Sequence, residues 1–132
     1  MPSQKEPLYR PRSAFGAALK EARAARSLGL REFCRRSGLD PALVSRIERG
    51  LAPPPEAAAT FNRIARGLRL SLSSTKWREL ADLAILSRGK VPKDLLDNEA
   101  VAAKLPVLFR ALRDLRSDQK LLQELVEILR KA

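Results

Sequence analysis

The side chains of this chain that are best suited to bind another molecule by hydrogen bonds and small apolar contacts lie in residues 41–49, PALVSRIER. If this segment is a helix, Val44 and Ile47 fall on one side, where they can be buried. The other side then carries Pro41, Ala42, Ser45, Arg46 and Arg49. An arginine can donate two hydrogen bonds to guanine, a serine hydroxyl can bond either kind of base edge, and an alanine methyl can contact the methyl of thymine. The exposed side of such a helix therefore suits the major groove of DNA.

The residues around this segment predict how it is positioned. A second amphipathic segment, 30–37, precedes it, and Gly38, Leu39 and Asp40 separate the two, which is the length of the turn in a helix-turn-helix unit. Gly38 can end the first helix in a left-handed conformation. Asp40 can cap the second helix, with Pro41 at its first position. The alternative is a helical hairpin that serves only packing and presents a solvated basic face.

Residues 37–50, SGLDPALVSRIERG, resemble the Cro/C1-type (XRE) helix-turn-helix family of phage and bacterial regulators. FGAALKEARAARSLGLREFCRR precedes this run and an alanine-rich segment containing FNRIARGL follows it, so that the resemblance covers about residues 15–70. The SRIERG run is its most specific part. The resemblance implies an all-α protein with a lambda-repressor-like five-helix DNA-binding domain that binds a palindromic operator as a dimer.

The resemblance also implies roles for single residues. The base-facing positions hold Pro41, Ala42, Ser45 and Arg46, with Leu30 at the start of the preceding helix, where a polar residue is common in the family. An arginine of the first helix pairs with the glutamate of the ERG run in the family, and these positions hold Arg23 and Glu48 here. Arg31 lies near the start of a helix, where it can hold a phosphate together with backbone N–H groups. We expect Arg49 and Arg12 to contact phosphates as well.

The charge balance favours a polyanionic partner. The chain has 132 residues, with 26 Lys and Arg against 15 Asp and Glu, a net charge of +11. Fourteen of the basic and six of the acidic residues lie in residues 1–70. Most of the excess positive charge therefore lies in the part of the chain that contains residues 41–49, the helix proposed to read DNA, which we call the reading helix. We find no apolar run long enough to span a bilayer and no signal peptide, so we expect a cytoplasmic, nucleoid-associated protein without a membrane partner.

The same composition argues against catalysis. The chain has no histidine and a single cysteine, Cys34, so it lacks the usual zinc ligands and the usual acid–base residue, and it carries no catalytic motif. We expect no enzyme activity, no catalytic residue, no metal and no cofactor. Cys34 is predicted to be a packed small hydrophobe rather than a redox sensor.

Three regions are predicted. Residues 1–12 read as a flexible basic arm that either lies along DNA or stays disordered. Residues 13–88 form the Cro/C1-type domain, with Ser13 capping a first helix that runs to Arg26, and with Trp77 as a core anchor in a last helix capped by Ser73 or Ser74. Residues 89–132 form a helical oligomerisation or partner region.

The last region is rich in leucine from Leu105 to Leu129. Pro106 predicts either a break or a kink in its helix, and Ser117 can cap the final helix. These helices either pair two copies of the chain or fold back on their own N-terminal domain. We favour pairing, because a two-fold operator needs a two-fold interface.

These observations predict a sequence-specific transcriptional regulator that binds double-stranded DNA, with a homodimeric repressor as the favoured form. The alternative is an antitoxin-type protein whose C-terminal helices neutralise a partner toxin while its DNA-binding domain autoregulates the operon. A repressor relieved by a regulatory protease that acts on the C-terminal region is a further alternative.

Overall fold

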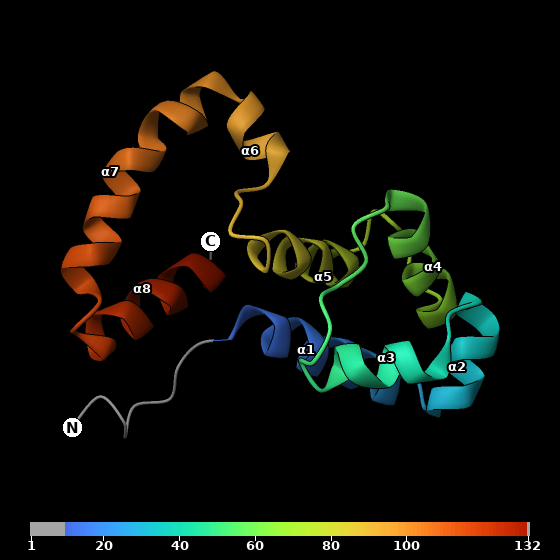
Figure 1. Ribbon diagram of the computed structural model, residues 1–132. Coiled ribbons are helices and arrows are strands. Elements are labelled where there is room, and N and C mark those ends of the chain that lie inside the picture. The colour runs from blue at the N-terminus through green and yellow to red at the C-terminus, as the bar shows by residue number, and fades with distance from the viewer. Residues whose placement is uncertain (1–9, 132) are drawn as a thin grey trace. The chain divides into compact units, whose positions relative to one another are not determined.

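The computed structural model describes residues 10–131, and every regular element in that range is a helix. The contacts divide the chain into two compact units, Met1–Val91 and Pro92–Ala132. Figure 1 shows the helices of both units. The predicted all-α class is confirmed. Residues 1–9, which make up most of the predicted arm, lie outside the described residues.

The first unit contains the five helices that the resemblance predicts. They are α1 (Pro11–Ala25), α2 (Leu30–Ser37), α3 (Pro41–Glu48), α4 (Ala58–Leu68) and α5 (Thr75–Leu86). Helix α1 packs against α3 and α5, while α2 packs against α3 and α4. The short helices α2 and α3 are therefore each fixed by longer neighbours.

Helix α1 begins earlier than predicted. It starts at Pro11, and no side chain caps its N-terminus, so the prediction that Ser13 is the cap is wrong. Proline is favourable at the first helical position because its φ is already helical and its missing N–H is not needed there. The predicted arm 1–12 is correspondingly shorter, since Arg12 is part of the helix.

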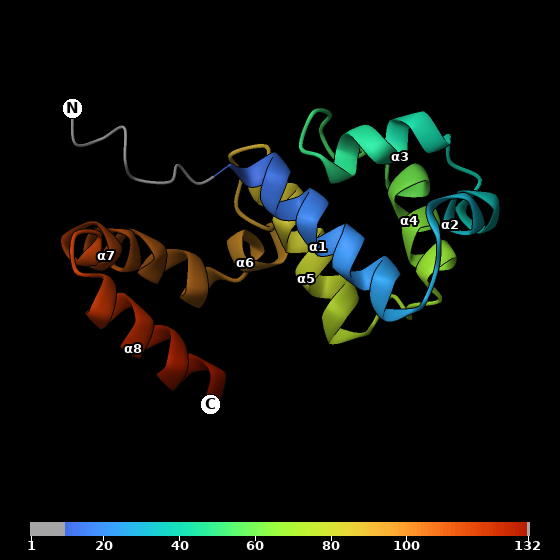
Figure 2. The ribbon, with the colours of Figure 1, turned by 90° about the horizontal axis from the view of Figure 1, so that it is seen from below.

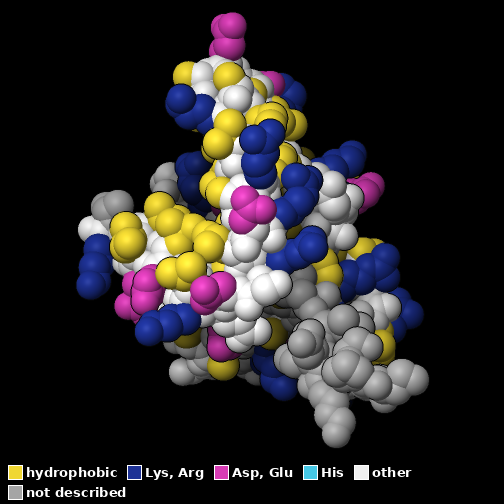
Figure 3. All heavy atoms as spheres, turned by 90° about the vertical axis from the view of Figure 1, so that its left-hand side faces the viewer, with side chains coloured by type: hydrophobic (Ala, Val, Ile, Leu, Met, Phe, Trp, Pro, Cys, Tyr) yellow, Lys and Arg dark blue, Asp and Glu magenta, His cyan; other side chains and the backbone are white. Residues whose placement is uncertain are grey.

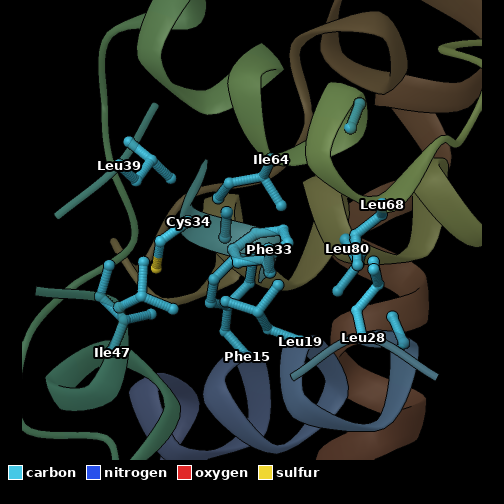
Figure 4. Close-up of a cluster of buried hydrophobic side chains, with 14 of the residues drawn as sticks. Phe15, Leu19, Leu28, Phe33, Cys34, Leu39, Ile47, Ile64, Leu68 and Leu80 are labelled. Carbon is cyan, nitrogen blue, oxygen red and sulfur yellow. The ribbon is translucent and has the colours of Figure 1, made fainter. Parts of the chain in front are cut away.

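The core of the first unit is built from all five helices. Phe15 of α1, Phe33 of α2, Ile64 of α4 and Leu80 of α5 are fully buried, and Figure 4 shows such side chains converging. Trp77 is 5% exposed, and its ring centroid lies 4.7 Å from that of Phe61, so the predicted core role of this tryptophan is confirmed. Ser74 caps α5 by accepting a hydrogen bond from the backbone N–H of Trp77 at 3.2 Å.

The second unit contains α6 (Lys93–Asp97), α7 (Glu99–Leu115) and α8 (Gln119–Lys131). Helix α7 continues through Pro106, so of the two predicted outcomes, a break or a kink, the break does not occur. Asp118, rather than the predicted Ser117, caps α8 by accepting a hydrogen bond from the N–H of Leu121 at 3.0 Å. A carboxylate and a hydroxyl can both cap a helix, and sequence alone did not distinguish these neighbours.

The second unit buries none of its described residues. Its exposed large hydrophobic residues include Val107 and Leu112 of α7 and Ile128 and Leu129 of α8, which are 68%, 38%, 65% and 64% exposed. Figure 3 shows such hydrophobic side chains at the surface, mixed with charged ones. No described helix combines the length and the apolar character needed to cross a bilayer.

Candidate nucleic-acid interface

Helix α3 presents the predicted side chains to solvent. Val44 and Ile47 are 0% and 1% exposed and face the core. Pro41, Ala42 and Arg46 are exposed, and Ser45 is half-buried. The exposed side of α3 therefore carries the four residues that were assigned to base edges.

The turn before α3 has the chemistry that the sequence predicts. Gly38 has φ 74°, in the left-handed region that suits glycine, and its N–H donates to the carbonyl of Cys34 at 2.8 Å. Asp40 accepts a hydrogen bond from the N–H of Leu43 at 3.0 Å through Oδ2. The end of α2 and the start of α3 are thus both closed by local hydrogen bonds.

Helix α1 packs closely against the C-terminal end of α3 at Gly16. A Cβ at Gly16 would lie 2.3 Å from the carbonyl oxygen of Ile47 and 2.7 Å from that of Glu48. Only a residue without a side chain allows the two backbones to approach this closely. This role of Gly16 was not predicted from the sequence, although a glycine inside a helical pattern is a signal of close packing.

An ion pair also fixes α3 to α1. Nε and Nη2 of Arg23 donate to the two carboxylate oxygens of Glu48 at 2.8 and 2.9 Å, and Nη1 donates to the carbonyl of Leu28 at 2.8 Å. The two side chains are only 13% and 7% exposed. The hydrogen bonds to Glu48 raise the pKa of the Arg23 guanidinium, against the opposing effect of burial. The pair predicted from the resemblance is therefore present, and it orients the C-terminal end of α3.

Helix α2 packs Leu30 against the core and exposes Arg31 to solvent. Leu30 is half-buried and packs against the core, which does not fit the base-facing role that the resemblance implies for its position. Arg31 is exposed and forms no ion pair with any described residue. Arg35 and Arg36 both form ion pairs with Glu32 of the same helix.

Two of the predicted phosphate residues come together. Arg12 of α1 and Arg49, the residue that follows α3, are both exposed and line the same open hollow. Nε of Arg49 donates to the carbonyl of Ser45 at 3.4 Å, which holds this arginine against α3. The sequence does not predict that Arg12 and Arg49 meet, because they are distant along the chain.

Cys34 is buried in the core, as predicted, with 4% exposure. Burial raises the pKa of its thiol, and the negative charges of Glu48 and Asp40 act in the same direction. The neutral thiol is thereby favoured, which suits a packing role. Within residues 10–131, no three histidine, cysteine or acidic side chains gather in a way that could hold a metal ion.

A comparison with protein families agrees with this geometry. Residues 14–76 match the family described as "Helix-turn-helix domain". The chain is also similar to the solved structure of the clp gene regulator ClgR from C. glutamicum, with 28% sequence identity, a TM-score of 0.46, and coverage of 67% of this chain and 100% of that one. No curated protein matches the chain. Residues 14–76 thus resemble a helix-turn-helix domain, the module with which many transcriptional regulators bind DNA.

Proposed function

We propose that this protein is a sequence-specific transcriptional regulator of the Cro/C1 type that reads double-stranded DNA with α3. The exposed side of α3 carries this proposal, because Ala42, Ser45 and Arg46 are accessible on a helix whose other side is buried. A helix with short and donor-bearing side chains, held rigidly by its neighbours, is what the major groove accepts. The proposed activity is binding and not catalysis.

Each exposed residue has a proposed role. Arg46 donates to a guanine, Ser45 bonds a base edge, and Pro41 and Ala42 make apolar contacts with bases. Arg31, Arg49 and Arg12 contact phosphates, which position the domain without reading sequence. Since these contacts release counterions from DNA, the affinity should fall steeply as salt rises.

The protein is proposed to act as a homodimer. One reading helix covers too few base pairs for a unique site, and two-fold pairs gain specificity from half-sites about one DNA turn apart. Helices α7 and α8 supply the proposed interface, since their large apolar side chains are exposed in the single chain. A dimer that occupies an operator within a promoter would block polymerase, so we favour a repressor acting on the chromosome in the cytoplasm.

Selection of DNA fragments bound by the full-length protein tests this proposal. We expect enrichment of inverted repeats whose half-sites are centred about 10 base pairs apart, and light scattering should give the mass of a dimer. Recovery of random fragments at equal frequency would contradict sequence-specific reading. Light scattering that gives a monomer on and off DNA would contradict the dimer but leave the reading helix in place.

A second candidate function follows from the same exposed apolar surface of α7 and α8. An antitoxin-type protein would use this surface to bind a partner toxin and would keep DNA binding for autoregulation. A toxin gene next to this gene, together with a purified toxin that binds the full-length protein but not a variant altered in α8, would favour this function. A stable homodimer in which α8 is protected from hydrogen exchange would favour the first proposal.

A further inference from the structure

We infer that the hollow between the N-terminus of α1 and the end of α3 binds a single phosphodiester of the DNA backbone. This inference rests on the proposed function and makes it more specific, because it assigns several residues to one phosphate. The hollow has a volume of about 380 Å³ and includes Arg10, Arg12, Ser13, Arg49, Gly50 and Ser87 in its lining. We refer to it as the arginine hollow.

Three parts of the first unit meet at the arginine hollow. Arg12 and Ser13 belong to the first turn of α1, Arg49 and Gly50 follow α3, and Ser87 follows α5. A Cβ at Gly50 would lie only 2.4 Å from Oγ of Ser13, so the start of α1 and the end of α3 are in direct contact. Figures 1 and 2 both show the N-terminal end of α1 beside the segment that follows α3.

Five of the eight residues that line the hollow carry side chains that can donate hydrogen bonds. Arg10, Arg12 and Arg49 contribute guanidinium groups, each of which can present two parallel N–H groups to an oxyanion. The first turn of α1 contains no acidic residue, and no side chain caps it. The first intrahelical bond is donated by the N–H of Ala14, so the N–H groups of Arg12 and Ser13 have no acceptor among the described residues.

The arginines of the hollow lack the carboxylate partners that some other arginines of the first unit have. Arg23 pairs with Glu48, and Arg88 lies 3.5 Å from Glu56. Within the described residues, Arg10, Arg12 and Arg49 form no ion pair, and the hollow has no acidic lining residue. Three positive side chains, together with the positive end of a helix dipole, favour an anion at this place.

The position of the hollow favours a phosphate of DNA over a free phosphorylated molecule. Arg49 directly follows α3 and is bonded to the carbonyl of Ser45, so the hollow continues the exposed side of the reading helix at its C-terminal end. A backbone that borders the groove occupied by α3 must pass the ends of that helix. A phosphodiester is therefore the anion that reaches the hollow when α3 is in the groove.

The salt dependence of DNA binding tests whether one phosphate is shared. We would compare the full-length protein with Arg12→Gln, Arg49→Gln and the double variant on a selected duplex, with Arg66→Gln on α4 as the matched control. Each single variant should weaken binding roughly tenfold, on specific and random DNA alike. The double variant should reduce the slope of log K against log salt by about 0.9, the value for one phosphate. A reduction near 1.8 would show two separate phosphates and overturn the shared site.

Ethylation interference locates the phosphate. In each half-site, ethylation of one phosphate should block binding of the unaltered protein and lose its effect on the double variant, while the other positions keep theirs. If the double variant kept the full pattern while inorganic phosphate alone shifted the amide resonances of Ser13 and Gly50, the hollow would be a site for free phosphate, and its assignment to DNA would be wrong.

The failure of this inference can be distinguished from the failure of the proposed function. If the unaltered protein prefers its selected duplex and the arginine variants behave like Arg66→Gln, the phosphate site is refuted and the regulator proposal stands. If the unaltered protein prefers no duplex, the proposed function fails, and the inference that rests on it fails as well.

Discussion

The two units of this protein differ in how they treat their hydrophobic residues. The structure shows sixteen buried hydrophobic residues, and all of them belong to the first unit. In the described part of the second unit, ten large hydrophobic residues are exposed and none is buried. Both units are helical, and both have regular apolar stripes. The difference is that the stripes of the first unit meet each other, whereas those of the second remain open to solvent.

The first unit forms a complete hydrophobic core within one chain, whereas residues 92–131 of the second unit do not. The first unit holds its reading helix by core packing, by the close approach at Gly16 and by the Arg23–Glu48 pair, all within one chain. A segment of about 40 residues rarely builds a sufficient core alone, and it usually needs a partner, a metal or disulfides. We therefore expect the second unit to need a partner, as in the proposed dimer.

The largest expected effect comes from a matched pair of leucines. Leu80→Ala removes a fully buried side chain from the first unit and should lower the free energy of unfolding by about 2 to 5 kcal/mol, because it leaves a cavity. Leu112→Ala alters a side chain that is 38% exposed in α7, and its cost should depend on protein concentration. Urea denaturation at several protein concentrations, followed by Trp77 fluorescence and by helical circular dichroism, measures both. A concentration-independent cost at Leu112 would refute the contrast.

The next effect comes from the ion pair that holds α3. Glu48→Ala leaves the Arg23 guanidinium without its partner in a site where it is 13% exposed, so we expect a loss of about 2 to 3 kcal/mol in stability. Glu32→Ala is the matched control, because Glu32 pairs with arginines on α2 that are more exposed than Arg23, and this change should cost less than about 1 kcal/mol. Equal losses in urea denaturation would show that burial of the Arg23–Glu48 pair does not matter.

A charge placed on the apolar surface of α8 should break the dimer. Leu129 is 64% exposed in the single chain, and Leu129→Lys would bury a charge at the proposed interface. We expect the dissociation constant of the dimer to rise about tenfold or more, equivalent to about 1.4 kcal/mol, in analytical ultracentrifugation. Gln123→Lys adds the same charge at an exposed polar position of α8 and should leave the mass unchanged. Dimers of normal affinity in Leu129→Lys would exclude this part of α8 from the interface.

The smallest expected effect concerns Cys34. Burial raises the pKa of its thiol, so the folded protein keeps the proton to a higher pH than the unfolded chain does. Stability should therefore fall as the pH rises above about 8.5, the usual value for cysteine, and the fall should end above the folded pKa. The Cys34→Ala variant should lack this part of the pH dependence in urea denaturation. A slope that is unchanged in the variant would have to come from other groups.

The parts of the fold that depend on short-range chemistry could be predicted from sequence. The bounds of α2, the left-handed Gly38, the Asp40 cap and the start of α3 at Pro41 all follow from residues within a few positions of each other. The burial of Val44 and Ile47 follows from their helical spacing. These features define the candidate reading helix, which is why its exposed residues could be named in advance.

The features that could not be predicted depend on contacts distant in sequence or on a choice between similar neighbours. Gly16 contacts α3 only in the folded chain, and Arg12 and Arg49 line one hollow only because the start of α1 packs against the end of α3. Asp118 rather than Ser117 caps α8, although both can accept the hydrogen bond. The arginine hollow belongs to the first kind, since its residues come from three separate parts of the chain.

The central claim is that the exposed side of α3 reads base pairs, and an equilibrium comparison of two arginine variants tests it most directly. The dissociation constants of Arg46→Ala and Arg31→Ala would be measured by fluorescence anisotropy on the selected duplex, on its single base-pair variants and on random DNA. Arg46→Ala should cost about 1 to 3 kcal/mol on the selected duplex and abolish the preference at one base-pair position, while Arg31→Ala should weaken binding to all duplexes by a similar factor. If Arg46→Ala weakened selected and random DNA equally and kept every base preference, α3 would not be the reading element.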